Sequence, residues 1–169
     1  AALATGTALH SFEVDDHNGG GKIHPGAAVI PAAFALGERE GISGAKLLAA
    51  ITAGYETMIR VSLATNPVSS RMRGWHLTGT CGTFGATAAA SVILGLDAET
   101  TASALGLAGT QSAGLYAFSA DGAMTKRLHS GLAAESGIRA ALRAARGFHG
   151  PRLVLEAEDG GFLAATSDD

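Results

Sequence analysis

Histidines that stand beside acidic or glycine-rich segments are the residues of this sequence best suited to chemistry. Histidine exchanges protons close to neutral pH, so it is the side chain most often used in acid–base catalysis. His10 and His149 have no supporting neighbours in the sequence, and we expect both to be structural. The remaining histidines are candidates for proton transfer or binding: His17, His24, His76 and His129.

The first cluster lies in an acidic loop. The segment Asp15–His17 is followed by three glycines and then by His24, which opens the motif His-Pro-Gly. Adjacent carboxylates can orient an imidazole ring or bind a cation, and functional residues concentrate in loops. The spacing fits equally a solvated acidic loop that leads into a helix at Pro25. The residues alone leave both interpretations open.

The second cluster runs from Gly74 to Thr80 and contains His76. Gly79, Gly82 and Gly85 stand three apart just ahead of a predicted helix. Exposed N–H groups at a glycine-rich helix entrance favour anions, including carboxylates. Glycines at this spacing also allow a neighbouring helix to pack closely, so two explanations compete. The presence of His76 favours a site.

The third cluster is basic. Lys126, Arg127 and His129 place three cationic or ionisable groups within four residues. Such a group can clamp carboxylates, although a solvated helix start also explains basic residues. No metal site is expected, because no His-x-x-x-His pair is present and Cys81 is the single cysteine.

The composition predicts closely packed helices. The chain has 169 residues, the size of one domain, and 47% of them are hydrophobic while only 5% are aromatic. Alanine and glycine dominate the apolar fraction, and small side chains favour closely approaching helices over a sheet rich in branched residues. The predicted fold class is therefore all-α, an Ala/Gly-rich helical bundle.

Charge and hydropathy exclude several classes of partner. The net charge of −3 provides no basic field for a phosphate backbone, so a nucleic-acid partner is not expected. The first residues lack the basic region of a signal peptide, and no apolar run reaches the roughly 20 residues of a membrane span. We therefore expect a soluble cytoplasmic protein with no membrane partner.

Capping residues and hydrophobic spacing define the expected helices. A helix already under way fills residues 1–11, and Ser43 and Asp97 are predicted N-caps. Residues 64–77 are expected to be irregular, and the run 153–155 to resemble a strand. Five further helices are predicted, over residues 25–40, 44 to about 63, 83–94, 98–109 and about 128–146.

The clusters and their order along the chain resemble the MmgE/PrpD family. The resemblance covers nearly the whole sequence and implies a large all-helical domain joined to a smaller α/β lid, usually in a homodimer. It also implies that no metal or organic cofactor is used. The matching segments are His10–Asp16, His24–Gly26, Gly74–His76, Thr78–Thr80, Phe84–Ala86, Leu105–Gln111, Lys126–His129 and Gly147–Pro151.

The resemblance also implies a division of the chain. Family members are over twice as long, so residues 1–151 are expected to form a helical domain that is incomplete at its N-terminus. Residues 152–169 would begin the connection toward a lid outside the chain, or form a disordered tail. The decarboxylase branch of the family has an aspartate at the position of Glu13.

The chemistry implied by the resemblance is proton transfer beside a carboxylate, with loss of water or carbon dioxide from a methylcitrate- or aconitate-like acid. His24 or His76 is expected to transfer protons and Lys126 to anchor a substrate carboxylate, because cations must stabilise the charge that develops. Asp15 or Asp16 would orient the loop or its histidine. Further substrate contacts are expected from Glu13, Asp15, His17, Thr78, Gly79, Arg127 and His129.

Two other functions remain open at this point. One is an epimerase or isomerase of a dicarboxylate, which would use the same pocket without net elimination. The other is a non-catalytic, truncated subunit that pairs with a longer partner supplying the lid.

Overall fold

Within residues 1–168, which the computed structural model describes, the chain folds into helices without a β-strand. The predicted all-α class is thereby confirmed. Two isolated β-bridges, Asn18–Ile23 and Trp75–Leu115, close loops rather than build a sheet. The α-helices are α1 (Ala2–Leu9), α2 (Pro25–Glu40), α3 (Gly44–Ala64), α4 (Pro67–Met72), α5 (Leu77–Leu94), α6 (Ala98–Gln111), α7 (Thr125–Ala144) and α8 (Phe162–Thr166), with the 3-10 helix η1 (Tyr116–Ser119) between α6 and α7.

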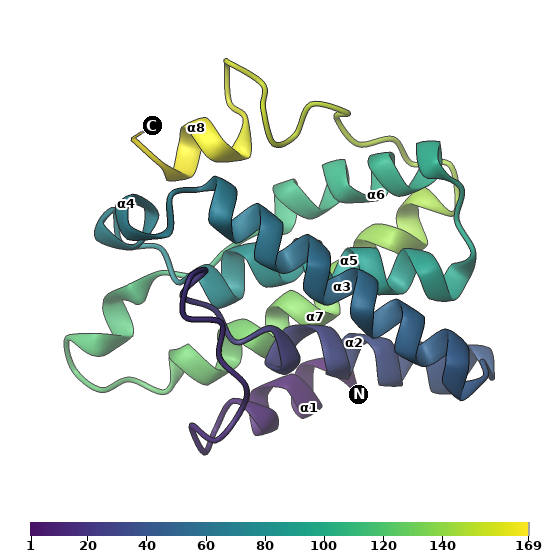
Figure 1. Cartoon of the computed structure of the whole chain (residues 1–169), viewed down its shortest axis with the longest axis horizontal. Coiled ribbons are helices and arrows are strands. Elements are labelled where there is room, and N and C mark those ends of the chain that lie inside the picture. The colour runs from purple at the N-terminus through teal and green to yellow at the C-terminus, as the bar shows by residue number, and fades with distance from the viewer. Residues whose placement is uncertain (169) are drawn as a thin grey trace.

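Helix α5 forms the centre of the fold, and α2, α3, α6 and α7 pack against it (Figure 1). Nearly every residue of α5 is buried, and its glycines make this possible. A Cβ atom on Gly85 would lie 2.8 Å from the carbonyl oxygen of Gly54 in α3, and one on Gly82 would lie 2.9 Å from the Cβ of Ala28 in α2. For these two glycines the packing explanation of their spacing therefore holds.

The predicted helix caps are confirmed. The Ser43 hydroxyl accepts a hydrogen bond from the Lys46 N–H at 3.3 Å, and the Asp97 carboxylate accepts one from the Thr100 N–H at 2.8 Å. Each satisfies a donor that the first helical turn leaves without a partner. Helix α2 is followed by its C-cap residue Gly41, whose φ of 64° is the left-handed conformation that glycine adopts without strain.

Three predicted boundaries are wrong. Helix α5 begins at Leu77 rather than near Thr83, so the whole glycine-rich entrance is helical. Residues 67–72 form α4 within the segment predicted to be irregular, because Pro67 suits the first helical position and the Asn66 side chain accepts from the Ser69 N–H. The run 153–155 forms turns instead of a strand, since no neighbouring strand is available to pair with it among residues 1–168.

The C-terminal segment folds back over the bundle. Figure 1 shows it crossing above α6 and ending in α8 beside α4. The Phe162 ring packs edge-on against Phe84 of α5, with ring centroids 4.9 Å apart, and the Asp168 carboxylate pairs with Arg73. Residues up to 168 are thus held by both apolar and ionic contacts.

Two helices, α3 and α5, are long and apolar enough to cross a membrane by length and composition alone. This is weak evidence, because the core helix of a soluble protein passes the same test. The most apolar window of α5 is 89% buried inside the fold, as a core helix requires. That of α3 is 28% buried, and this helix carries the ion pair between Glu56 and Arg60 on its exposed side.

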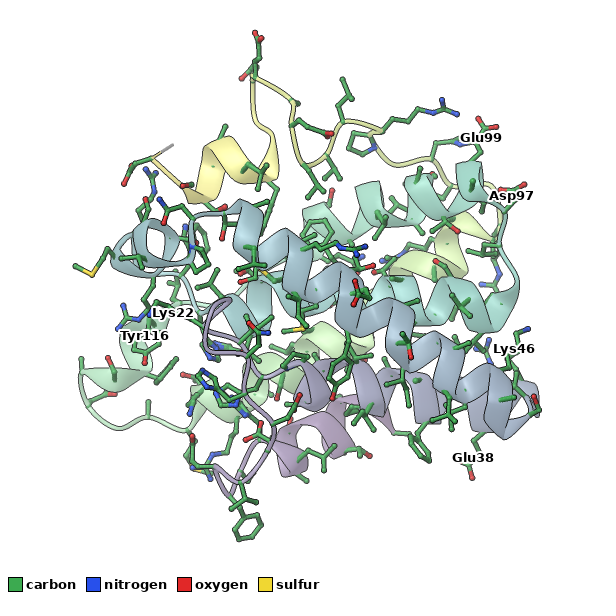
Figure 2. All side chains as sticks on the ribbon, in the orientation of Figure 1. Lys22, Glu38, Lys46, Asp97, Glu99 and Tyr116 are labelled. Atoms are coloured by element: carbon green, nitrogen blue, oxygen red, sulfur yellow. The ribbon has the colours of Figure 1, made fainter. Side chains whose placement is uncertain are left out.

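Four segments far apart in the sequence meet at one end of the bundle. They are the loop between α1 and α2, the junction of α4 and α5, helix η1, and the first turn of α7 (Figure 1). Figure 2 places Lys22 and Tyr116 at this end, and Lys46, Asp97 and Glu99 at the opposite end. All three sequence clusters are therefore brought to the same end of the molecule.

Candidate active site

A cavity of about 260 Å³ opens where these four segments meet. A larger cavity of about 390 Å³ lies between α6 and the C-terminal segment, but neither a histidine nor a cationic side chain lines it. The chemistry therefore points to the smaller cavity. Its lining residues are His17, Lys22, His24, Arg71, His76, Leu77, Thr78, Tyr116 and Lys126.

The lining of this cavity is cationic. Lys22, Arg71 and Lys126 contribute positive charge, and no carboxylate is among the lining residues. The Arg71 guanidinium lies 3.2 Å above the centre of the Tyr116 ring, a cation–π contact that holds it in place. A cavity of this size and charge suits a small anion that carries several carboxylates.

Four lining residues were not among the predicted site residues: Lys22, Arg71, Leu77 and Tyr116. Lys22 and Leu77 lie inside the first two sequence clusters, close to His24 and His76, while Arg71 belongs to the unpredicted helix α4. Tyr116 belongs to η1, a single short turn with no sequence motif. Only the tertiary fold brings Arg71 and Tyr116 to the histidines, so spacing along the chain carried no signal for these two residues.

His24 is held as a neutral base. Its Nδ1 lies 2.9 Å from the backbone oxygen of Asp16, and because a carbonyl can only accept, Nδ1 carries the proton. The other nitrogen, Nε2, is therefore bare. Burial lowers the pKa of His24 below its ordinary value, and the nearby Asp15 carboxylate opposes this shift. The backbone N–H of His24 donates to the Thr78 hydroxyl at 3.2 Å, which ties the loop to α5.

His76 is the N-cap residue of α5 and is only 4% exposed. Its backbone N–H donates to the Gly114 oxygen at 3.0 Å, and its Nδ1 lies 3.0 Å from the Nδ1 of His129. Burial lowers the pKa of His76 to about 3, with a smaller contribution in the same direction from the neighbouring His129. His76 is therefore neutral over the physiological range.

His10 belongs to the same cluster, and the prediction that it lacks neighbours is wrong. Its Nδ1 lies 2.6 Å from the Asp15 carboxylate, and its ring centroid lies 4.8 Å from that of His24 and 6.0 Å from that of His76. The chain reverses after α1 and so brings together two residues that are five apart in the sequence. Sequence spacing gave no sign of this pair, because residues five apart do not share a face of an α-helix or of a β-strand.

Asp16 has a positioning role in the structure. Both of its carboxylate oxygens accept from the Gly26 N–H, at 2.9 and 3.2 Å, at the start of α2. The Tyr55 hydroxyl is also bonded to this carboxylate, and burial together with the negative charge raises the pKa of Tyr55. Asp16 thus anchors the loop that presents His24, although its side chain is not part of the cavity lining.

Lys126 lines the cavity and forms an ion pair with Glu13 from the loop after α1. This hydrogen bond with Lys126 lowers the pKa of Glu13, so the carboxyl is ionised at neutral pH. An ammonium group has three N–H donors, so Lys126 can hold Glu13 and a second carboxylate together. Glu13 itself stands outside the cavity lining.

The predicted site residues fall into three groups. His17, His24, His76, Thr78 and Lys126 line the cavity, and Glu13, Asp15, Asp16 and His129 contact these lining residues. Gly79 serves packing, since a Cβ there would lie 2.7 Å from the Ala113 oxygen. The side chain of Arg127 is not among the lining residues.

His10, Asp15 and His24 are near enough to share a metal ion, with donor atoms all within 4.8 Å of one another. The charge of the site disfavours metal binding here, because three cations line the adjacent cavity and would repel another positive charge.

An all-helical domain with neutral histidines in a cationic cavity is suited to acid–base chemistry on a small polycarboxylate. The chain belongs to the MmgE/PrpD family: a family model of the MmgE/PrpD N-terminal domain matches residues 1–169. The resemblance expected from the sequence is thereby confirmed.

Curated relatives of this chain are cis-aconitate decarboxylases and a protein similar to them. The chain is 36% identical to the cis-aconitate decarboxylase-like protein oryM of Aspergillus oryzae, over 96% of this chain and 35% of that protein. It is 33% identical to the cis-aconitate decarboxylase of Aspergillus terreus, over 96% and 34%, and 36% identical to the human enzyme, over 95% and 34%. The chain therefore spans about a third of the length of these relatives.

Proposed function

We propose that this chain forms the proton-transferring wall of a lyase that decarboxylates a small tricarboxylate of the cis-aconitate type. The observation that carries the proposal is the cavity itself, in which three cations surround two neutral histidines. The curated relatives whose names describe cis-aconitate decarboxylation support this substrate class. A dehydratase would use the same groups, but these relatives favour loss of carbon dioxide.

The protein must do two things in this reaction: stabilise negative charge and deliver a proton. When the carbon–carbon bond breaks, carbon dioxide leaves and the bonding electron pair stays on the substrate, where a carboxylate delocalises it. Cations facing the remaining carboxylates stabilise this charge, and we assign that role to Lys126, Lys22 and Arg71. A proton must then be delivered to carbon, and we assign its transfer to His76 or His24.

Binding of cis-aconitate tests the assignment of Lys126. Lys126→Ala removes a cavity cation, and it should weaken binding by about tenfold or more, since a charge-assisted hydrogen bond contributes roughly 1.5–3 kcal/mol. The matched control is Lys46→Ala, which removes the same charge at the far end of the molecule (Figure 2). Isothermal titration of both variants and the unsubstituted chain gives the comparison. Equal binding by the two variants would contradict the assignment.

A further inference from the structure

The contact between His76 and His129 has a geometry that constrains where protons can lie. The two Nδ1 atoms are 3.0 Å apart, and the rings come from the start of α5 and the first turns of α7. A Cβ on Gly79 would lie only 3.0 Å from the Cβ of His129, so the small residue is required for this approach. The Phe118 ring meets both imidazoles edge-on, at centroid distances of 5.1 and 6.0 Å.

Two nitrogens can share a hydrogen bond only when one carries a proton and the other is bare. For two neutral imidazoles this allows two arrangements. In the first, the proton lies on Nδ1 of His129, and His76 carries its own proton on Nε2. In the second, the proton lies on Nδ1 of His76, and Nε2 of His76 is bare. Because Nδ1 of His76 faces His129, Nε2 is the nitrogen available to the cavity that His76 lines.

The surroundings of His76 disfavour the doubly protonated ring. The ionisable groups that face it are His10 after α1, His24 before α2, Tyr116 of η1, and Lys126 and His129 of α7. Each adds positive charge or none, and the ring is almost completely buried. A proton that arrives on one nitrogen of His76 must therefore leave promptly from the other. His129 is half-buried, so it has partial contact with solvent.

We propose that His129 is a positioning residue that relays protons between solvent and His76 across the Nδ1–Nδ1 hydrogen bond. When Nε2 of His76 gives its proton to the substrate carbon, the Nδ1 proton of His129 moves to Nδ1 of His76, and Nε2 of His129 takes a proton from water. One proton enters as one leaves, and both rings are neutral before and after. After the product leaves, water in the emptied cavity protonates Nε2 of His76, the shared proton returns to Nδ1 of His129, and Nε2 of His129 gives its proton to the hydroxide left in the solvent. The hydroxide left in the cavity combines with the released carbon dioxide as bicarbonate.

This role goes beyond the substrate contact expected for His129. It rests on the proposed function, because the relay supplies protons to that reaction. It also explains why His129, which does not line the cavity, is held against His76, which does. A neutral pair that exchanges tautomers can act as an acid or as a base without movement of any heavy atom.

His129→Asn tests the relay in turnover of cis-aconitate. The asparagine amide can hydrogen-bond to Nδ1 of His76 in either arrangement, but it cannot pass a proton on. We expect kcat to fall by at least about 10²-fold with KM little changed. Added imidazole should restore part of the activity of His129→Ala. His149→Asn, at an exposed histidine beside Asp97 and Glu99, is the matched control and should leave the rate unchanged. A normal kcat in His129→Asn would overturn the relay.

Ring-nitrogen NMR tests the same inference without any substrate. In the chain labelled with ¹⁵N-histidine, exchange between the two arrangements should give His76 and His129 nitrogen shifts intermediate between those of bare and protonated nitrogens near neutral pH. In His129→Asn the His76 nitrogen shifts should no longer show this exchange with a second histidine, whereas in His149→Asn they should be unchanged. A single fixed tautomer of His76 in the unsubstituted chain would overturn the relay. If that chain leaves cis-aconitate unchanged, the proposed reaction fails, while this spectrum still decides the relay.

Discussion

At the scale of single residues, the site depends on histidines that burial keeps neutral and whose Nδ1 atoms are held by defined hydrogen bonds. His24 has its Nδ1 proton committed to the Asp16 backbone oxygen, and His76 has its Nδ1 committed to His129. The hydrogen bond at one nitrogen determines what the other can do, which is how proteins commonly set the role of an imidazole. Asp15 adds a negative charge beside His10 and His24.

Asp15 should set the pKa of His24. Its carboxylate oxygen lies 3.6 Å from Nδ1 of His24 and favours the protonated ring, which partly offsets the effect of burial. Asp15→Asn removes this charge, so the pKa of His24 should fall further and its protonation should require more acid. An NMR titration of the histidine rings measures the shift. A pKa of His24 that rises or stays in place in Asp15→Asn would show that another group controls it.

The motif residues of the site were predictable from the sequence, and their partners were not. His24, His76 and Lys126 stand in segments with a recognisable composition, and all of them line the cavity. Arg71 and Tyr116 have no such context, because their place in the site is created by the packing of α4 and η1. The partner of His10 could not be predicted either, because the fold brings Asp15 to it where the chain reverses after α1.

At the scale of elements, the positions of the site residues are fixed because the helices that carry them pack with their backbones in close contact. Helix α5 carries His76 at its start and contacts α2, α3, α6 and α7. Most of this arrangement followed from composition, since alanine and glycine predict close helices. The start of α5 was misplaced because its glycines suggested a loop, whereas burial among other helices stabilises the helical form at those positions.

Gly85→Ala should destabilise the bundle. The new Cβ would lie 2.7 Å from the Cβ of Met58 and 2.8 Å from the Gly54 oxygen, so α3 and α5 would have to separate. Overpacking of this kind costs about 1–3 kcal/mol in the free energy of unfolding. The control is Gly44→Ala, where no atom lies within 4 Å of the new Cβ. Urea unfolding compares them, and equal losses in both variants would refute the packing argument.

At the scale of the whole molecule, burying neutral histidines links stability to pH. The pKa of His76 is lowered from 6.5 to about 3, so between these values the unfolded chain binds a proton that the folded chain does not. The stabilisation is therefore fully present above pH 6.5 and is lost as the pH falls below it. The lowered pKa values of His24 and His129 act in the same direction.

We expect the free energy of unfolding to fall by about 1.4 kcal/mol for each pH unit below 6.5 for one such histidine. His76→Asn removes this contribution, so its stability should depend less steeply on pH. His149→Asn changes an exposed ring and should leave the slope as it is. Denaturant unfolding between about pH 5 and pH 7 measures the slopes. Identical slopes for His76→Asn and the unsubstituted chain would contradict the buried neutral state of His76.

Turnover of cis-aconitate in deuterated water tests the central claim most directly, with the product followed by NMR and mass spectrometry. We expect a product that has lost one carbon as carbon dioxide and carries one deuterium on carbon. We also expect His76→Ala to form this product at least about 10²-fold more slowly. A product that keeps all its carbons would indicate an isomerase, an epimerase or a dehydratase running in reverse instead. Such a product, no reaction at all, or an undiminished rate in His76→Ala would contradict the account.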